Sequence, residues 1–265
     1  MNSRVLQQLV LYAVLLAAWQ ILAVLYPSTW LPSPLDIARV FTEKQFLEKL
    51  VDAYTLTALR AVTGFALGLV AGLVIGLGTG LLASPLTGSL EGLASIAASV
   101  PSIAWIPLLI AAMGIDSFRL PVAASFFCSF PPILYQVFSA LRSIDPEEVA
   151  VAQTLGAEGP YLWRTIILPR VVEKIFPAAK IEAVMTWKTV FAAEMIAVPS
   201  GLGYLAMIYA DLLDVAHVAA IILVLTLSVA LIVHALNTLE KKILAKRGLG
   251  VEQWGSIYAY TAQGY

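Results

Sequence analysis

The sequence predicts an all-α membrane protein, a bundle of about six transmembrane helices. Of its 265 residues, 60% are hydrophobic and 12% are charged, and its mean hydropathy is +0.87, whereas soluble domains carry about 25% charged residues. A helix needs about 20 apolar residues to cross the hydrocarbon core of a bilayer. The net charge of -1 gives no sign of a nucleic-acid partner, and the lone Cys128 can form no internal disulfide.

Six apolar runs are long enough to span a bilayer. They cover residues 9–26, 55–83, 90–113, 120–141, 171–198 and 218–236. The first follows Arg4 as in a signal peptide, but it is long and no small-residue cleavage site follows it, so we interpret it as a retained span. We expect one membrane domain, with a first span and an external amphipathic segment in residues 1–53, a core in 54–240 and a tail in 241–265.

The placement of Lys and Arg sets the expected orientation, because short loops rich in them stay in the cytoplasm. Both termini and the loop between the fourth and fifth runs would be cytoplasmic, with basic residues at Arg4, Arg142, Arg164, Arg170, Lys174, Lys241, Lys242, Lys246 and Arg247. The external side holds fewer, at Arg39, Lys44, Lys49 and Arg119. In the external residues 27–52 the apolar positions are spaced as in an amphipathic helix, which predicts a helix lying on the outer membrane surface.

The second run carries a glycine every four residues, at Gly64, Gly68, Gly72, Gly76 and Gly80. Such a stripe lets another helix approach closely, and close packing drives helix association in lipid. A packing face inside one bundle is the favoured interpretation, and a dimer interface is the alternative.

Prolines interrupt the later runs, where they remove a backbone hydrogen bond and kink the helix. They are Pro101 and Pro107 in the third run, Pro121, Pro131 and Pro132 in the fourth, and Pro177 in the fifth. The freed carbonyls need protein or water. Residues 101–107 either line a pathway or fit a curved bundle, and the sequence leaves both open.

Ionisable residues inside spans are costly and are therefore candidates for function. They are Arg60, Lys180, Glu182, Lys188 and Glu194. We expect Arg60, near the outer end of its run, to extend to the headgroups rather than to contact a substrate. The heptad spacing of Lys180, Trp187 and Glu194 places them on one helical face. For Lys188 and Glu194, a structural ion pair and a place along a pathway remain equally open.

The search for reactive chemistry gives negative results. The sequence has no Gly-x-x-x-x-Gly-Lys-Ser/Thr stretch to hold nucleotide phosphates. The two histidines, His217 and His234, do not have metal-ligand spacing, so packing or interfacial roles are favoured. We find no nucleophilic triad and no dense chain of carboxylates that would relay protons. A transporter of this kind would take its energy from another subunit.

A polar segment, residues 145–169, interrupts the apolar sequence. Asp145 is a predicted N-cap, followed by Pro146 and two acids, Glu147 and Glu148, in the first turn, where the helix dipole favours them. Gly156 can take the left-handed conformation that ends a helix. A capped helix joined to two spans would act as a lever, whereas an ordinary loop helix on the membrane surface is the simpler alternative.

The same segment carries a family resemblance. Gly156 followed by Ile166, Leu168 and Pro169 resembles the cytoplasmic loop of the permease subunits of binding-protein-dependent ABC importers. Further matches resemble the nitrate, sulfonate, bicarbonate and taurine branch of those permeases. They lie at residues 30–34 (WLPSP), 57–60 (TALR), 64–65, 101–107, 114–115, 193–195 (AEM) and 201–204 (GLGY).

The resemblance implies a type I ABC importer permease fold in the cytoplasmic (inner) membrane. It implies a homodimer of this chain, two ATP-binding subunits that hold ATP and Mg, and a soluble binding protein outside the cytoplasm. The solute would be a small oxyanion or an organosulfonate-like compound, and this chain would hold no cofactor, metal or catalytic residue. The alternative is a secondary transporter coupled to an ion gradient.

Two sets of site residues follow from this reading. The contact with the ATP-binding subunits is expected in a coupling helix at about residues 145–158, through Glu147, Glu148, Ala150, Ala152, Thr154, Leu155, Gly156 and Ala157. The candidates for the translocation path are Pro101, Pro107, Trp187, Lys188 and Glu194.

One position departs from the family pattern. The Glu-Ala-Ala that begins the family's loop, six residues before the glycine, is Ala150, Val151 and Ala152 here. Either Glu147 and Glu148, one turn earlier, replace the missing acid, or the partner's groove has a different shape. The tail at residues 248–265 lies outside the resemblance.

Overall fold

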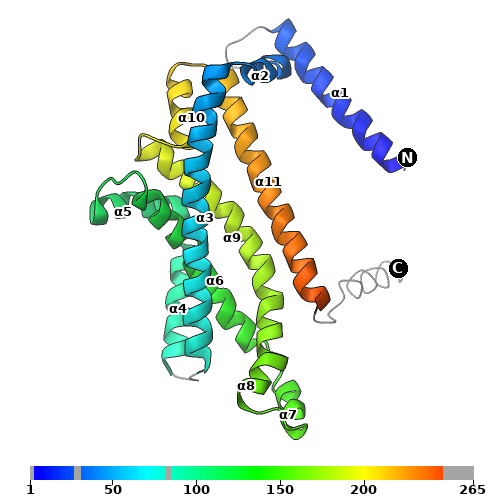
Figure 1. The fold of residues 1–265 in the computed structure, drawn as a ribbon, viewed down its shortest axis with the longest axis vertical. Helices are drawn as coiled ribbons and strands as arrows, with labels where there is room; N and C mark the ends of the chain where they lie inside the picture. Colours follow the sequence, from blue (N-terminus) through cyan, green and yellow to red (C-terminus); the bar gives the residue numbers. More distant parts are fainter. Residues whose placement is uncertain (1–2, 27–30, 82–84, 247–265) are drawn as a thin grey trace.

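The computed structural model describes residues 3–26, 31–81 and 85–246, and these form helices joined by turns (Figure 1). The helices are α1 (Ser3–Leu25), α2 (Pro34–Val40), α3 (Lys44–Leu81), α4 (Pro85–Ser99), the 3-10 turn η1 (Ser102–Ala104), α5 (Trp105–Met113), α6 (Arg119–Arg142), α7 (Pro146–Thr154), α8 (Gly159–Leu162), the π-helical turn η2 (Trp163–Ile167), α9 (Leu168–Ile196), α10 (Leu202–Asp211) and α11 (Val215–Lys246). Residues 241–246 of the predicted tail are the last residues of α11, and residues 247–265 lie outside the described part of the chain.

The bundle is built around α9, which packs along α3, α6 and α11. In Figure 1, α2 and α10 lie at the upper end of the bundle, here named the α10 end. The helices α7 and α8 lie at the lower end, named the α7 end, and α1 extends away from the rest. The two ends are therefore separated by the length of the bundle.

The prediction of a helical membrane bundle is confirmed, but the number of apolar spans differs. Among the described residues four helices are long and apolar enough to cross a membrane, within α1, α3, α6 and α11. The bent pair formed by α4 and the helical segment 102–113 would be a fifth if the pair is one broken span rather than a re-entrant loop. The 29 residues of α9 extend about 43 Å at the usual rise of an α-helix. α9 contains too many ionisable residues to count as an apolar span by composition. We place it in the membrane because it packs against α3, α6 and α11 inside the bundle.

The expected third span, residues 90–113, is not one helix. The chain turns by 92° between α4 and η1, at Val100 and Pro101, and continues as α5. Pro101 thus breaks the helix, whereas Pro107 lies in the first turn of α5, where a missing backbone N–H costs nothing. The prolines predicted a kink, and the structure has a right-angled break.

The expected helix on the outer membrane surface is also replaced by a different arrangement. The segment forms α2 and the first turns of α3, and its apolar side chains pack inside the protein. Ile37, Val40, Phe46 and Leu50 are buried in a cluster that also contains Leu202, Leu205, Ala220 and Ile221. An amphipathic pattern alone does not show whether the apolar face meets a membrane or another part of the protein. Here it packs against α10 and α11.

The glycine stripe is the packing face between α3 and α6, so the interpretation as a contact within the bundle is confirmed. A Cβ at Gly64 or Gly68 would overlap Ser125 or Ser129 of α6. Cβ atoms at Gly72 and Gly76 would overlap Ile133 and Val137. The four-residue steps on the two helices match, which brings the two backbones close together.

We predict that Gly68→Ala lowers the free energy of unfolding by about 1–3 kcal/mol, because the new methyl group must displace Ser129 and the backbone N of Phe130. Gly78→Ala is the control, since nothing lies within 4 Å of a Cβ at Gly78 and alanine favours the helix. Thermal unfolding of the purified chain in mild detergent measures both. Equal midpoints for the two variants would contradict the assigned packing.

Candidate functional site

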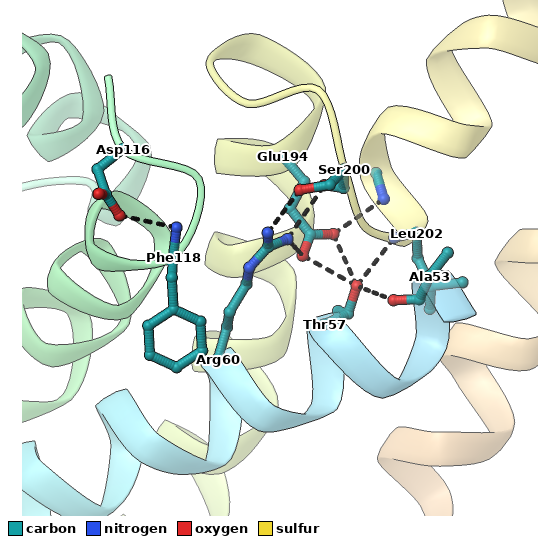
Figure 2. Close-up of polar contacts among 9 residues, drawn as sticks. Ala53, Thr57, Arg60, Asp116, Phe118, Glu194, Ser200 and Leu202 are labelled. Carbon is teal, nitrogen blue, oxygen red and sulfur yellow. Dashed lines mark hydrogen bonds and ion pairs between the residues drawn. The ribbon is translucent and has the colours of Figure 1, made fainter. Parts of the chain in front are cut away.

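A buried ion pair lies at the α10 end of the bundle. Arg60 of α3 is 1% exposed and Glu194 of α9 is 0% exposed, and Nη1 of Arg60 donates to Oε1 of Glu194 at 2.7 Å (Figure 2). The expectation that Arg60 extends to the headgroups is therefore wrong. Because α3 begins at Lys44 rather than near residue 55, Arg60 lies well inside the helix and turns inward to its counter-ion.

Thr57, one helical turn before Arg60, completes the pairing of the carboxylate. Its Oγ1 lies 2.9 and 2.8 Å from the two oxygens of Glu194 and accepts a hydrogen bond from the backbone N–H of Leu202 at 2.8 Å. The backbone N–H of Gly203 donates to Oε2 of Glu194 at 3.0 Å. The carboxylate thus accepts from a guanidinium, a backbone amide and a hydroxyl, which offsets the cost of its burial.

The guanidinium also holds the connection between α9 and α10. Arg60 donates from Nη1 to the carbonyl oxygen of Ser200 at 3.0 Å and from Nη2 to Oγ of Ser200 at 2.6 Å. Its Nε has no hydrogen-bond partner in the described part of the chain. We name this set, Thr57, Arg60, Glu194, Ser200 and the amides of Leu202 and Gly203, the α10 clamp. It joins α3, α9 and the start of α10.

Two glycines let the chain pass over the Glu194 carboxylate. Gly201 has φ +98°, in the left-handed region that favours glycine, and a Cβ there would overlap the carboxylate of Glu194. A Cβ at Gly203 would overlap the carbonyl oxygen of Phe191. The Gly-Leu-Gly sequence is therefore required by the close approach of α10 to α9.

We predict that Gly203→Ala lowers the free energy of unfolding by about 1–3 kcal/mol, because the methyl group meets backbone that cannot move aside and pushes the 203 amide away from Glu194. Gly92→Ala in α4, where nothing lies within 4 Å of a Cβ, is the control. Denaturant unfolding followed by tryptophan fluorescence measures the difference. A Gly203→Ala midpoint as high as that of the control would show that α10 does not approach α9 this closely.

The predicted path candidates lie on α9 and near the break after α4, and Ser102, next to Pro101, is bonded to Thr189 of α9 at 2.8 Å. Glu194 is paired with Arg60 and not with Lys188, which is exposed on α9. Trp187 is buried beside Ala61 and Val190, and Pro101 and Pro107 are exposed near the break after α4. Lys180 binds Glu240 at 2.8 Å and Asn237 at 3.0 Å, both on α11. The ion pairs of α9 thus join it to its neighbours.

At the other end of the bundle, the capped helix has the local structure that the sequence predicts. Oδ1 of Asp145 accepts from the backbone N–H of Glu147 at 2.9 Å, and Pro146 takes the first position of α7. Gly156 follows the helix with φ +85°. Both ends of α7 are therefore determined by residues within the segment itself.

The inner face of α7 is fixed to the start of α9. Ala152, Ala157 and Leu162 form a small buried cluster, with Val149, Ile166 and Ile167 packed against it. Glu148 accepts from Nη2 of Arg170 on α9 at 2.8 Å. Glu148, one of the two acids placed to replace the missing family glutamate, is therefore bonded within this chain.

The outer face of α7 and the following turn are apolar and open. Val151 is 60% exposed, Leu155 83% and Tyr161 63%, and Glu147, Ala150, Thr154 and Gly156 are also exposed. We name Val151, Leu155 and Tyr161 the α7 patch. Among the expected contact residues, Ala152 and Ala157 are buried, whereas Leu155 belongs to this patch.

Two further features concern capping and metal binding. Asp116, in the turn before α6, accepts from the backbone N–H of Arg119 at 2.6 Å and from that of Phe118 at 2.9 Å, the contact drawn in Figure 2. These hydrogen bonds lower the pKa of Asp116 below its usual range. Within the described residues no three His, Cys, Asp or Glu side chains are placed to hold a metal ion.

The comparisons identify the family. Residues 64–247 match the model of the binding-protein-dependent transport system inner membrane component, and the chain belongs to this family. It is the permease subunit of an ABC importer, an integral membrane transport protein and not an enzyme.

Named relatives place it in one branch. The putative aliphatic sulfonates transport permease protein of Escherichia coli is 33% identical over 72% of this chain and 73% of its own length. The taurine transport system permease protein of the same organism is 26% identical over 61% of this chain and 58% of its own length. The resemblance to the nitrate, sulfonate and taurine branch is thereby confirmed.

Solved structures support the fold. The MetNI methionine ABC transporter in an inward-facing conformation aligns with a TM-score of 0.64 at 19% identity, covering 76% of this chain and 99% of that chain. At this identity the likeness concerns the fold alone. The type I importer permease fold is confirmed.

The α10 clamp was the part of the site that sequence reasoning missed. Its two charges are separated by 134 positions, so no local pattern pairs them. A usable signal was nevertheless present, because Arg60 and Glu194 are opposite charges near the same end of two spans, and an isolated charge there is costly.

Proposed function

We propose that this chain imports a small oxyanion or organosulfonate-like solute as a homodimer, with two ATP-binding subunits docked on α7 and a soluble binding protein that delivers the solute. The observation that carries the proposal is α7 itself. It presents an exposed apolar patch on one face and is fixed to α9 by its other face. A membrane protein that exposes Val151, Leu155 and Tyr161 together offers a surface for a protein partner.

The proposed orientation places the α7 end and both termini in the cytoplasm. The basic residues near α7 and at the end of α11 support it, since short cytoplasmic loops are enriched in Lys and Arg. Exposed members of this set include Arg142, Arg164, Lys174 and Lys242. The α10 clamp would then lie near the outer face, opposite the ATP-binding subunits.

The proposed path runs along the open face of α9. Ile181 is 57% exposed and Met185 is 42% exposed, and Lys188 is exposed on the same side. An ammonium group deep in a spanning helix is costly in lipid, so we infer that this face meets water or the second copy. The positive charge of Lys188 suits an anionic solute, which agrees with the names of the relatives.

Movement of α7 would reach the outer face through α9. α9 begins at the α7 end, beside the π-helical turn η2, and carries Glu194 of the α10 clamp in its last turn. Closure of the ATP-binding subunits would shift the equilibrium between outward and inward openings by as much as nucleotide binding differs between the two states. α9 thus connects the α7 end to the α10 clamp.

The test is reconstitution of the chain with its ATP-binding subunit and binding protein in proteoliposomes. We expect ATP-dependent uptake of a sulfonate, taurine or nitrate, and no uptake when the ATP-binding subunit is omitted. Accumulation by the chain alone under an ion gradient would overturn the proposal and establish a secondary transporter. Thermal-shift screening of the binding protein against oxyanions and sulfonates identifies the solute to use.

A further inference from the structure

An open groove lies between α3, α9 and α11, away from both the α10 clamp and the α7 patch. Its volume is about 350 Å³, which is within the usual range of ligand pockets. Every side chain that lines it is apolar. They come from residues 65–77 of α3, residues 168–179 of α9 and residues 236–243 of α11.

The glycine stripe of α3 explains where the groove lies. The α3 residues that line it, Phe65, Leu69, Leu73 and Leu77, each follow directly after a glycine of the stripe. They therefore lie on the flank of α3, beside its contact with α6, and the leucines pack toward the start of α9. Both α3 and α11 pack on α9, and α11 diverges from α3 toward the α7 end (Figure 1). α9 thus forms the floor of the groove, and α3 and α11 form its walls.

The dimensions of the groove suit a hydrocarbon chain. Its α3 wall extends from Phe65 to Leu77, about 18 Å at the rise of an α-helix. One leaflet contributes about half of the roughly 30 Å hydrocarbon core, so an acyl chain of one leaflet has a similar length. An oxyanion or a sulfonate would find no hydrogen-bond donor among these side chains, and we therefore exclude the transported solute as the occupant.

Cations lie where the groove reaches the α7 end. Arg164 lies about one turn before the first α9 residue of the groove, and Lys241 and Lys242 directly precede its last α11 residue. All three are exposed. Among the described residues, the ion pairs near this end are made by other cations, Arg142, Arg170 and Lys180. The charges at the mouth of the groove are therefore available to an anion.

We propose that the groove binds one acyl chain of an anionic phospholipid of the inner leaflet, with the phosphate of its headgroup at Arg164 and Lys242. Basic pockets between spanning helices on the cytoplasmic side hold anionic headgroups in this way. The assignment to the inner leaflet uses the orientation proposed above, in which the α7 end is cytoplasmic. Because α9 is the floor of the groove, the bound lipid would brace the helix that joins α7 to the α10 clamp.

The experiment is photo-crosslinking of the full-length chain in phosphatidylcholine vesicles that contain a minor amount of either phosphatidylglycerol or phosphatidylcholine with a photoactivatable acyl chain. Mass spectrometry of the peptides locates the crosslinks. We expect residues 65–77 and 168–179 to be labelled roughly fivefold or more by phosphatidylglycerol relative to phosphatidylcholine, the effect of one cation close to an anionic headgroup. The exposed apolar helix α1 is the internal reference for ordinary lipid contact, and its two labelling levels should be similar.

Two pairs of variants test the headgroup and the acyl chain separately. Arg164→Gln with Lys242→Gln should reduce the preference for phosphatidylglycerol to the level of α1. Lys44→Gln with Lys49→Gln, two exposed cations at the start of α3, is the matched control and should keep the preference. Leu73→Trp fills the groove and should lower its labelling by both lipids, whereas Val74→Trp, at a position 65% exposed, should not.

Three results would overturn the proposal. The first is labelling of the groove with no more preference for phosphatidylglycerol than α1 shows, which is ordinary lipid contact. The second is a preference that survives Arg164→Gln with Lys242→Gln; these surface changes do not depend on whether Leu73→Trp folds. The third is a groove labelled by neither lipid, which would show that a second copy of the chain covers it.

Discussion

Replacement of Arg60 by methionine is expected to lower the free energy of unfolding by about 3–5 kcal/mol. The methionine fills much of the same space, but it leaves Glu194 buried with no cation, and removal of one partner of a buried pair costs this much. The remaining donors, the amide of Gly203 and the hydroxyl of Thr57, do not replace a full charge. Thermal unfolding and protease resistance in detergent measure the loss.

The double variant Arg60→Met with Glu194→Leu is the informative comparison. Because an apolar pair of similar volume often replaces a buried ion pair without loss of stability, the double variant should recover most of the stability lost by the single variant. Lys188→Met, which changes an exposed cation on α9, should leave the unfolding midpoint nearly unchanged. If Arg60→Met unfolds at the same midpoint as Lys188→Met, then Glu194 is not the buried partner of Arg60.

The double variant also shows whether the α10 clamp contributes to transport as well as to stability. Should the clamp serve only to hold the bundle together, the double variant would transport as well as the natural chain once its stability is restored. Should it also transmit movement from α9 to α10, transport would stay impaired while unfolding is normal. Uptake in proteoliposomes at matched protein amounts distinguishes these two roles.

The features that were predicted correctly are those set by a few neighbouring residues. The cap at Asp145, the glycine end at Gly156 and the four-residue stripe of α3 depend on spacing along one helix, which the sequence contains directly. The break at Pro101 was indicated by proline chemistry, but its right angle depends on where α5 packs, against Leu120 and Ala124 of α6. Local chemistry located the break, and tertiary packing set the angle.

The features that were missed depend on which surfaces meet. The sequence predicts Arg60 near the headgroups because the apolar run around it starts at residue 55, whereas α3 begins at Lys44. The amphipathic pattern predicts that the apolar face of α2 meets the membrane surface, whereas this face packs on α11. From its position in the sequence, Glu148 could contact a partner subunit. In the structure it binds Arg170, which lies 22 positions later in the chain, so local spacing does not indicate the contact.

The second large effect concerns the contact with the ATP-binding subunits. Leu155→Asp is expected to abolish co-purification of the permease with its ATP-binding subunit, because Leu155 is the most exposed residue of the α7 patch and a buried charge replaces an apolar anchor. Removing such an anchor typically costs about 2 kcal/mol or more, roughly a thirtyfold loss of affinity. The chain should fold normally, since the side chain contacts solvent in the isolated permease.

Gln153→Asp is the matched control, because Gln153 is exposed on α7 and lies about half a turn away from Val151 and Leu155. It adds the same charge to the same helix outside the patch, so it should leave the complex intact. Glu148→Arg is a poorer test of docking, since it places a second cation against Arg170 and disturbs the inner face of α7. If Leu155→Asp keeps the complex and Gln153→Asp loses it, the ATP-binding subunit docks on the side of α7 that carries Gln153. The roles assigned here to the two faces of α7 would then be wrong.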